Sequence, residues 1–151
     1  MPIERAQIVA LARRWIGTPF VHQASLKGAG CDCLGLVRGV WRELFGAEPE
    51  PMPSYRADWA ELTGEELLYQ GMARHCLARE AQSLRRGAAL APGSIVLIRL
   101  KPNGRAKHSA IAAAGDRIVH AYSGGAVTES ALPPAWRRRI AFAFDFPGVT
   151  D

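Results

Sequence analysis

The spacing of apolar residues changes near the middle of the chain, and this change constrains the fold more than any other feature. Up to about residue 86 apolar residues recur at helical intervals, whereas from residue 94 onward they form short runs separated by turn residues. Helices followed by strands indicate an α+β protein with an antiparallel sheet, because a parallel sheet would require the two to alternate. The length of 151 residues is most simply that of one domain, residues 1–151, which can bury a core without cross-links.

Two helices are predicted before residue 47. Pro2 and Glu4 are typical of a helix start, and the glycine and proline within residues 17–19 end this first helix. Asp32 occupies the N-cap position of the second helix, whose apolar face continues until Gly46. An irregular loop rich in glycine separates the two helices.

The following segment combines a loop with a third helix. Residues 47–62 contain several prolines and are interpreted as a long ordered loop, in which Tyr55 is a candidate for a wall of the substrate site or a cover over the core. Thr63 and Glu66 form a capping box. We therefore expect a helix from this point to about Arg86.

The remaining residues predict an antiparallel meander. Its strands are expected at residues 94–100, 107–114, 117–122, 126–130 and 137–146. Asn103 and Gly104 are a strong signal for a hairpin between the first two of these strands. Phe142, Phe144 and Phe146 alternate with other residues, so the last strand is expected to be half-buried.

Charge and hydropathy exclude several classes of function. The net charge is +5, but the basic residues are scattered apart from Arg137, Arg138 and Arg139, so we predict a solvated or docking surface there and no nucleic-acid partner. No apolar run is long enough to span a bilayer, and residues 1–15 lack the apolar stretch of a signal peptide. We therefore expect a protein made in the cytoplasm and not inserted into a membrane.

The thiol of Cys33 is the first candidate for chemistry. If Asp32 caps the second helix, Cys33 is its first residue, where the positive end of the helix dipole lowers a thiol pKa and favours the nucleophilic thiolate. A buried core cysteine is the alternative interpretation of this position.

The other cysteines indicate neither a disulfide nor a metal site. Cys31, Cys33 and Cys76 are an odd number, and a bridge between Cys31 and Cys33 would be strained. A zinc site that adds His75 to these three is disfavoured, because paired zinc ligands are usually two to four residues apart. Cys31 is expected to be a small loop residue, and the alternative is that it traps an oxidised Cys33.

Two histidines give Cys33 possible partners. His108 and His120 lie on neighbouring predicted strands, joined by a Gly-Asp turn that could bring both to one face of the sheet. A helix start packed on that face would place a thiol, a base and a group that orients the base together, as thiol peptidases require. Two unrelated polar histidines remain the alternative.

Together these residues resemble the NlpC family of cell-wall cysteine peptidases. The resemblance covers most of the chain and rests on "RRWIGTPF", "CDCLGL", "APGSIVLIRL", "KHSAIAAAGDRIVHA" and "SGGAVTES". It implies a papain-like fold, with N-terminal helices packed on an antiparallel sheet, and no cofactor. It also implies hydrolysis of an amide bond in a peptidoglycan stem peptide, beside D-glutamate or diaminopimelate. In the pattern of this family Cys33 is the nucleophile, His108 the base and His120 the residue that orients the base.

The chain departs from the family pattern around this trio. Leu34, Ser94 and Phe20 stand where the family has serine, aspartate and tyrosine. The candidate substrate-binding residues are Phe20, His22, Asp32, Tyr55 and Ser109.

The ending of the chain carries a second resemblance. Cys31, the chain length and the segment "AWRRRIAFAFDFP" are similar to the branch of this family carried by tailed phages and phage-like gene transfer agents. This branch implies tail or baseplate proteins as partners, and action on the wall in the periplasm after export in a particle. Two further hypotheses are a catalytically latent structural tail or baseplate hub that retains the fold, and acyl or amide transfer on lipid-like substrates.

Overall fold

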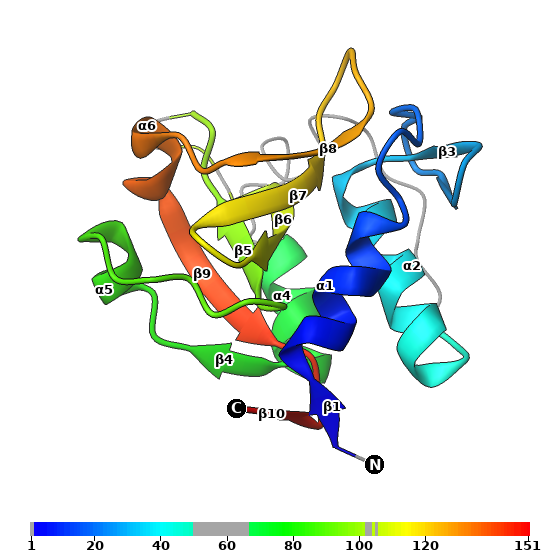
Figure 1. Ribbon diagram of the computed structural model, residues 1–151. Coiled ribbons are helices and arrows are strands. Elements are labelled where there is room, and N and C mark those ends of the chain that lie inside the picture. The colour runs from blue at the N-terminus through cyan, green and yellow to red at the C-terminus, as the bar shows by residue number, and fades with distance from the viewer. Residues whose placement is uncertain (1, 50–66, 102–103, 105) are drawn as a thin grey trace.

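A six-stranded antiparallel sheet lies at the centre of the computed structural model, which describes residues 2–49, 67–101, 104 and 106–151 (Figure 1). The strands of this sheet are β4 (Leu77–Arg79), β5 (Ile95–Ile98), β6 (His108–Ala113), β7 (Arg117–Ala121), β8 (Val127–Ala131) and β9 (Ile140–Asp145). They lie in the order β4-β9-β5-β6-β7-β8. Two short pairs accompany them: β2 (Ser25–Leu26) with β3 (Gly30–Cys31), and β1 (Ile3–Glu4) with β10 (Val149–Thr150).

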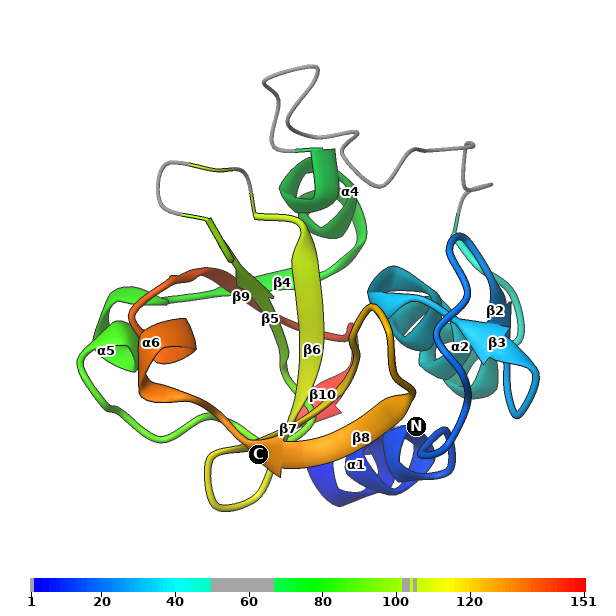
Figure 2. The same ribbon diagram turned by 90° about the horizontal axis from the view of Figure 1, so that it is seen from above.

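Helices cover both faces of the sheet (Figures 1 and 2). The helices are α1 (Arg5–Arg13), α2 (Cys33–Phe45), α4 (Leu67–His75), α5 (Gln82–Arg85) and α6 (Pro134–Arg137). Apolar residues of α1, α2 and α4 pack on one face with Leu97 and Ile111, whereas α5 and α6 lie on the other with Val96 and Ala110. Because side chains alternate along a strand, β5 and β6 contribute to both cores. No helix in the described part of the chain is long and apolar enough to cross a membrane.

α1 and α2 approach each other closely at Gly39. A Cβ atom at this position would collide with the indole of Trp15, which is buried directly after α1. Glycine therefore allows the aromatic ring to lie flush against α2, and the packed pair places the start of α2 over the sheet.

The first predicted helix begins later than expected. Ile3 and Glu4 pair with β10, so Pro2 lies before the helix and α1 begins at Arg5. Hydrogen bonding to a distant strand draws the first residues into extended conformation, against their local preference.

The prediction of one helix to about Arg86 is wrong. α4 ends at His75, residues 77–79 form β4 against β9, and α5 is a separate short helix. Pairing with β9 outweighs the local helical pattern here. Thr63, Glu66 and most of the expected loop at residues 47–62 lie outside the described residues.

The meander is confirmed for β5 to β8, with a different place for the last strand. β9 pairs with β5 and β4 instead of following β8 at the edge. It begins at Ile140, because the preceding Pro134–Arg137 segment is helical. Ala143 and Phe144 are both buried, on opposite faces, so this strand is not half-buried as expected. Burial on both faces is what an inner position requires.

Candidate active site

α2 begins at Cys33, as predicted. Asp32 has the extended conformation of an N-cap residue, and its Oδ1 accepts a hydrogen bond of 2.7 Å from the Gly35 N–H. Its Oδ2 accepts a second bond of 2.8 Å from the Gln23 N–H. Both carboxylate oxygens of Asp32 therefore bind backbone amides, one in the helix and one in the loop before it.

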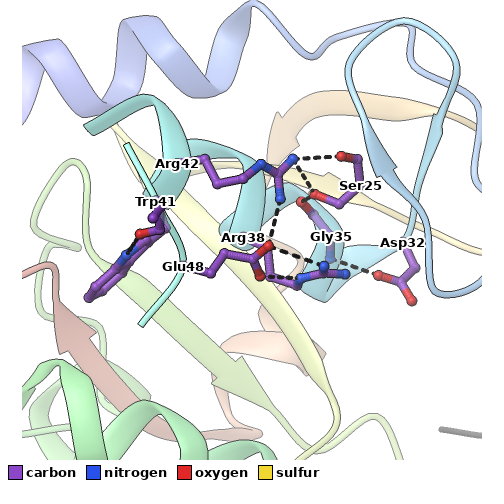
Figure 3. Close-up of polar contacts among 8 residues, drawn as sticks. Ser25, Asp32, Gly35, Arg38, Trp41, Arg42 and Glu48 are labelled. Atoms are coloured by element: carbon purple, nitrogen blue, oxygen red, sulfur yellow. Dashed lines mark hydrogen bonds and ion pairs between the residues drawn. The ribbon is translucent and has the colours of Figure 1, made fainter. Parts of the chain in front are cut away.

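The first turn of α2 is fastened to this loop (Figure 3). Ser25 Oγ donates to the Gly35 carbonyl at 2.6 Å, and Arg42 Nη2 donates to the Ser25 carbonyl at 2.6 Å. Gly35 has no room for a side chain, because a Cβ atom would collide with the Ala24 carbonyl. These contacts fix the helix start, and with it Cys33.

Glu48 holds the outer side of α2 (Figure 3). Its carboxylate pairs with Arg38 at 2.6 Å and with Arg42 at 3.1 Å, while Trp41 Nε1 donates to the Ala47 carbonyl at 2.9 Å. Burial alone would raise the pKa of Glu48, but hydrogen bonds and charge from the two arginines outweigh burial and hold that pKa below its usual value. The segment that follows α2 is thereby kept against the helix.

The Cys33 sulfur lies against the start of β6. Sγ donates a hydrogen bond of 3.6 Å to the carbonyl of Lys107, the residue before His108. Among the described residues no hydrogen bond joins this sulfur to the His108 ring. Burial raises the pKa of the Cys33 thiol, and the charge of Asp32 adds to this, whereas the N–H and hydroxyl of Ser109 act in the opposite direction. The pKa of this thiol is therefore shifted in the direction opposite to the expectation, with burial as the largest cause.

His108 and His120 are joined directly. Nε2 of His108 lies 3.1 Å from Nδ1 of His120, with the rings edge to face. Burial, followed by the neighbouring His120, lowers the pKa of His108 to about 3, and burial also lowers the pKa of His120. Both imidazoles are therefore neutral at pH 7. The expected meeting of the two histidines across the β6–β7 hairpin is confirmed. The expectation that the helix start packs on the same face is wrong, because α2 packs on the opposite face with Ile111 and Val119.

β8 adds a polar group that the sequence analysis missed. Ser130 Oγ lies 3.4 Å from Nε2 of His120. In the β7–β8 register Ser130 faces Ile118, so it is a diagonal neighbour of His120. The polar run at residues 128–130, beside the strand that carries His120, is the signal that could have pointed to it.

An aromatic cover, formed by Tyr122 and Trp136, lies over the imidazole pair. Trp136 of α6 contacts His108 and His120 with ring centroids 5.3 and 5.5 Å apart. Tyr122, just after β7, lies 5.7 Å from His108 and 5.5 Å from Trp136. No spacing rule connects residue 136 to residues 108 and 120, so this cover could not be predicted.

Two arginines hold α6 in place. Arg137 Nη1 donates to the Leu84 carbonyl at 2.9 Å, and Arg139 Nη1 donates to the Leu100 carbonyl at 2.6 Å. They fasten α6 to α5 and to the end of β5. The prediction of a solvated or docking cluster is therefore wrong for these two side chains.

The predicted substrate-binding residues fall into different environments. Phe20 is half-buried beside the core, and His22 is exposed, with Nδ1 3.9 Å from Asp32 Oδ2. Ser109 is completely buried and faces Cys33, so a substrate cannot reach it. Tyr55 lies outside the described residues.

The cysteines are free thiols. Cys31 is completely buried, and burial raises its pKa to about 12. Burial also raises the pKa of Cys76 to about 12. The ring centroids of His75 and Trp41 lie 6.4 Å apart. Within the described ranges no group of three or more His, Cys, Asp or Glu side chains is arranged to hold a metal ion.

Comparison with solved structures identifies the fold of this chain. No protein-family model and no curated protein sequence matches the chain. The NlpC/p60 domain of the peptidoglycan hydrolase SagA matches with a TM-score of 0.62 and 23% identity, covering 95% of this chain and 100% of that one. The fold is that of NlpC/p60 domains.

Two further solved structures agree with this assignment. An NlpC/p60 family protein from Bacillus cereus has a TM-score of 0.66 and 14% identity, and covers 97% of this chain and 41% of its own. The peptidoglycan hydrolase RipB from Mycobacterium tuberculosis has a TM-score of 0.56 and 16% identity, and covers 93% of this chain and 65% of its own. The chain therefore spans less than two thirds of these two proteins. The expected α+β papain-like fold is confirmed.

Proposed function

We propose that the protein is a cysteine peptidase that hydrolyses an amide bond in peptidoglycan stem peptides. The observation that carries the proposal is the placement of the Cys33 thiol at the start of α2, against the residue that precedes His108, with His108 hydrogen-bonded to His120. The peptidoglycan hydrolases SagA and RipB, which share the fold, support the choice of substrate.

The proposed reaction uses side chains of this chain and one water molecule. Cys33 Sγ attacks the carbonyl carbon of the amide while its proton passes to Nδ1 of His108. The carbon–nitrogen bond then breaks, His108 returns the proton to the leaving amine, and a thioester remains on Cys33. Water, deprotonated by His108, hydrolyses the thioester and releases the thiol and a carboxylic acid. The N–H of Cys33 at the helix start is an oxyanion donor.

One of the two hydrogen-bond directions along the His108–His120–Ser130 series gives the tautomer that this reaction requires. If Nε2–H of His108 donates to Nδ1 of His120, then Nδ1 of His108 keeps the lone pair that accepts the thiol proton. His120 then carries its proton on Nε2, where the Ser130 hydroxyl accepts it. Ser130 thus completes the orientation of the base through His120.

The resting site holds a neutral thiol and a neutral imidazole. The pKa of Cys33 is raised and that of His108 is lowered, so proton transfer from sulfur to nitrogen is unfavourable until a substrate is bound. Sγ must also leave the Lys107 carbonyl before it can reach Nδ1 of His108. Catalytic hydrogen bonds often form only in the substrate complex, so this resting geometry is consistent with the proposed reaction.

Digestion of purified diaminopimelate-type peptidoglycan tests the proposal. We expect the wild type to release stem-peptide fragments whose masses identify the cleaved bond. Cys33→Ala should lower the rate of release by more than about a thousandfold, because the nucleophile is lost. Cys31→Ala, checked for folding by thermal unfolding, is the control and should retain activity. Equal release by Cys33→Ala and the wild type would exclude Cys33 as the nucleophile.

The cellular setting is a second part of the proposal. On the resemblance of its last segment, we propose that the protein is made in the cytoplasm and reaches the wall as a tail or baseplate component of a phage-like particle. Particles purified from the producing cells should contain it, as detected by mass spectrometry. Its presence only in the particle-free fraction would contradict this setting.

A further inference from the structure

Ser109 carries a polar group without a visible structural purpose. Its side chain is completely buried, and among the residues that the structure describes its Oγ has no hydrogen-bond partner. A buried hydroxyl without a partner is costly, so its presence calls for an explanation. The N–H and the hydroxyl of Ser109 also oppose the rise that burial causes in the pKa of the Cys33 thiol.

The backbone of β6 explains why the sulfur lies at this place. The Ala112 N–H donates to the Ser94 carbonyl and the Ala112 carbonyl accepts from the Gly93 N–H, so even-numbered residues of β6 direct their backbone groups toward β5. Odd-numbered residues direct theirs toward β7. Pairing with β7, however, ends at Ile111. The Lys107 carbonyl and the Ser109 N–H therefore face an open end of the sheet, which the Cys33 sulfur occupies.

We propose that Ser109 is a positioning residue for Cys33: its N–H and its hydroxyl donate to the sulfur once the thiol has lost its proton. In the thiol form Sγ donates to the Lys107 carbonyl. When the proton leaves for a base, that bond is lost, and the anionic sulfur accepts from Ser109 two residues further along the strand. The unpaired start of β6 thus binds the Cys33 sulfur in both its thiol and its thiolate form. The catalytic meaning of this device rests on the proposed function, whereas the thiol chemistry does not.

The rate of alkylation of Cys33 as a function of pH tests the inference. The titratable groups next to the sulfur are Cys31 and Asp32 before α2, and Lys107 with His108 at the start of β6. All four stay in place in Ser109→Ala. Iodoacetamide is used as the probe, and the modified peptide is followed by mass spectrometry so that Cys31 and Cys76 do not interfere. We expect Ser109→Ala to react about tenfold more slowly than the wild type at pH 8, with the same limiting rate at high pH, because a hydrogen bond to the thiolate is lost.

Ser94→Ala is the matched control. Ser94 is buried at the opposite end of the β5–β6 pair, and its hydroxyl donates to the Ala91 carbonyl at 2.7 Å. The pH profile of Cys33 alkylation in Ser94→Ala should superimpose on that of the wild type. Ser109→Ala should unfold within about 4 °C of the wild type, since no hydrogen bond of the resting structure is broken.

Two results would overturn the inference: a profile of Ser109→Ala identical to that of the wild type, or a rate lowered equally at every pH. The assay uses no peptidoglycan, so either result leaves the proposed function untouched. Conversely, if Cys33→Ala digested peptidoglycan as fast as the wild type, the proposed function would be wrong. The pH profile of Cys33 alkylation would not be affected by that result.

Discussion

Asp32 has two effects of opposite sign on the candidate nucleophile. Its carboxylate caps α2 through the Gly35 N–H and thereby defines the helix start. Its negative charge, however, raises the pKa of the adjacent Cys33 thiol and so disfavours the thiolate. The residue that positions the sulfur therefore also restrains its reactivity before substrate binds.

Asp32→Asn separates the two effects. The amide oxygen can keep the cap to the Gly35 N–H but the amide nitrogen loses the bond from the Gln23 N–H, so the free energy of unfolding should fall by about 1–2 kcal/mol. Asp32→Ala loses both bonds and should fall by about 2–3 kcal/mol. Removal of the charge should speed alkylation of Cys33 at pH 8 by about threefold. The direction is opposite to that expected for Ser109→Ala. An unchanged or slower reaction of Asp32→Asn would show that its charge does not influence the sulfur.

At the scale of the elements, α6 controls the environment of the imidazole pair. Trp136 lies at ring-contact distance from both His108 and His120, and Arg137 fixes the helix to α5. Because burial is the largest cause of the lowered pKa of His108, removal of this cover should admit water and raise that pKa.

Trp136→Ala is expected to move the pKa of His108 from about 3 toward the ordinary value of about 6.5. The sign follows from burial, which disfavours the charged ring. In the wild type His108 stays neutral, and able to accept a proton, down to about pH 3, whereas the variant should lose its base below about pH 6. Proton NMR titration of the imidazole signals measures this midpoint. Trp136→Phe retains an aromatic ring and should stay near the wild type, and a midpoint below about 4 in Trp136→Ala would contradict the expectation.

The elements that could be predicted are those with strong local signals. The cap at Asp32 and the glycine at Gly46 define α2, and turn residues define the hairpins between β5 and β8. The sequence predicts β9 as a strand, but not its place between β4 and β5, and it does not predict β4 at all. Both outcomes depend on pairing between distant parts of the chain. Local pattern favoured a continuous helix through residues 77–79, whereas the strand forms only in the presence of β9.

The candidate site likewise contains residues that could be predicted and residues that could not. The cap predicts where Cys33 lies on its helix, and the hairpin brings His108 to His120. The direction of the thiol pKa could not be predicted, since it depends on how deeply the folded protein buries the sulfur. Trp136 comes from α6, whose packing no local pattern specifies, whereas Ser130 lies on the predicted β7–β8 hairpin and could have been found.

At the scale of the whole molecule, a cluster of ion pairs joins distant parts of the chain. The Arg5 guanidinium at the start of α1 binds both carboxylate oxygens of Asp145 at 3.0 Å, and Arg79 of β4 adds a bond of 2.8 Å. Burial alone would raise the pKa of Asp145, but these arginines outweigh burial and hold that pKa below its usual value. Asp145 therefore connects α1, β4 and β9.

Asp145→Asn should lower the free energy of unfolding at pH 7 by about 2 kcal/mol, less than for a fully buried pair. A carboxylate whose pKa is lower in the folded state contributes stability that is present above about pH 4 and is lost as the pH falls through the folded value. The difference between variant and wild type should therefore vanish toward about pH 2. Urea unfolding at several pH values measures it, and a difference that does not change with pH would rule out this linkage.

The parallel pair of β1 and β10 also has a mechanical consequence. Ile3 pairs with Val149 and Glu4 with Thr150, and the two ends of the described chain lie close together (Figure 1). Tension applied through both ends would load this parallel pair in shear, with its hydrogen bonds strained together and not one after another. Until that clamp ruptures, the chain between the two strands lies outside the path of the force. The sulfur and the imidazoles would thus bear no load while the molecule is pulled.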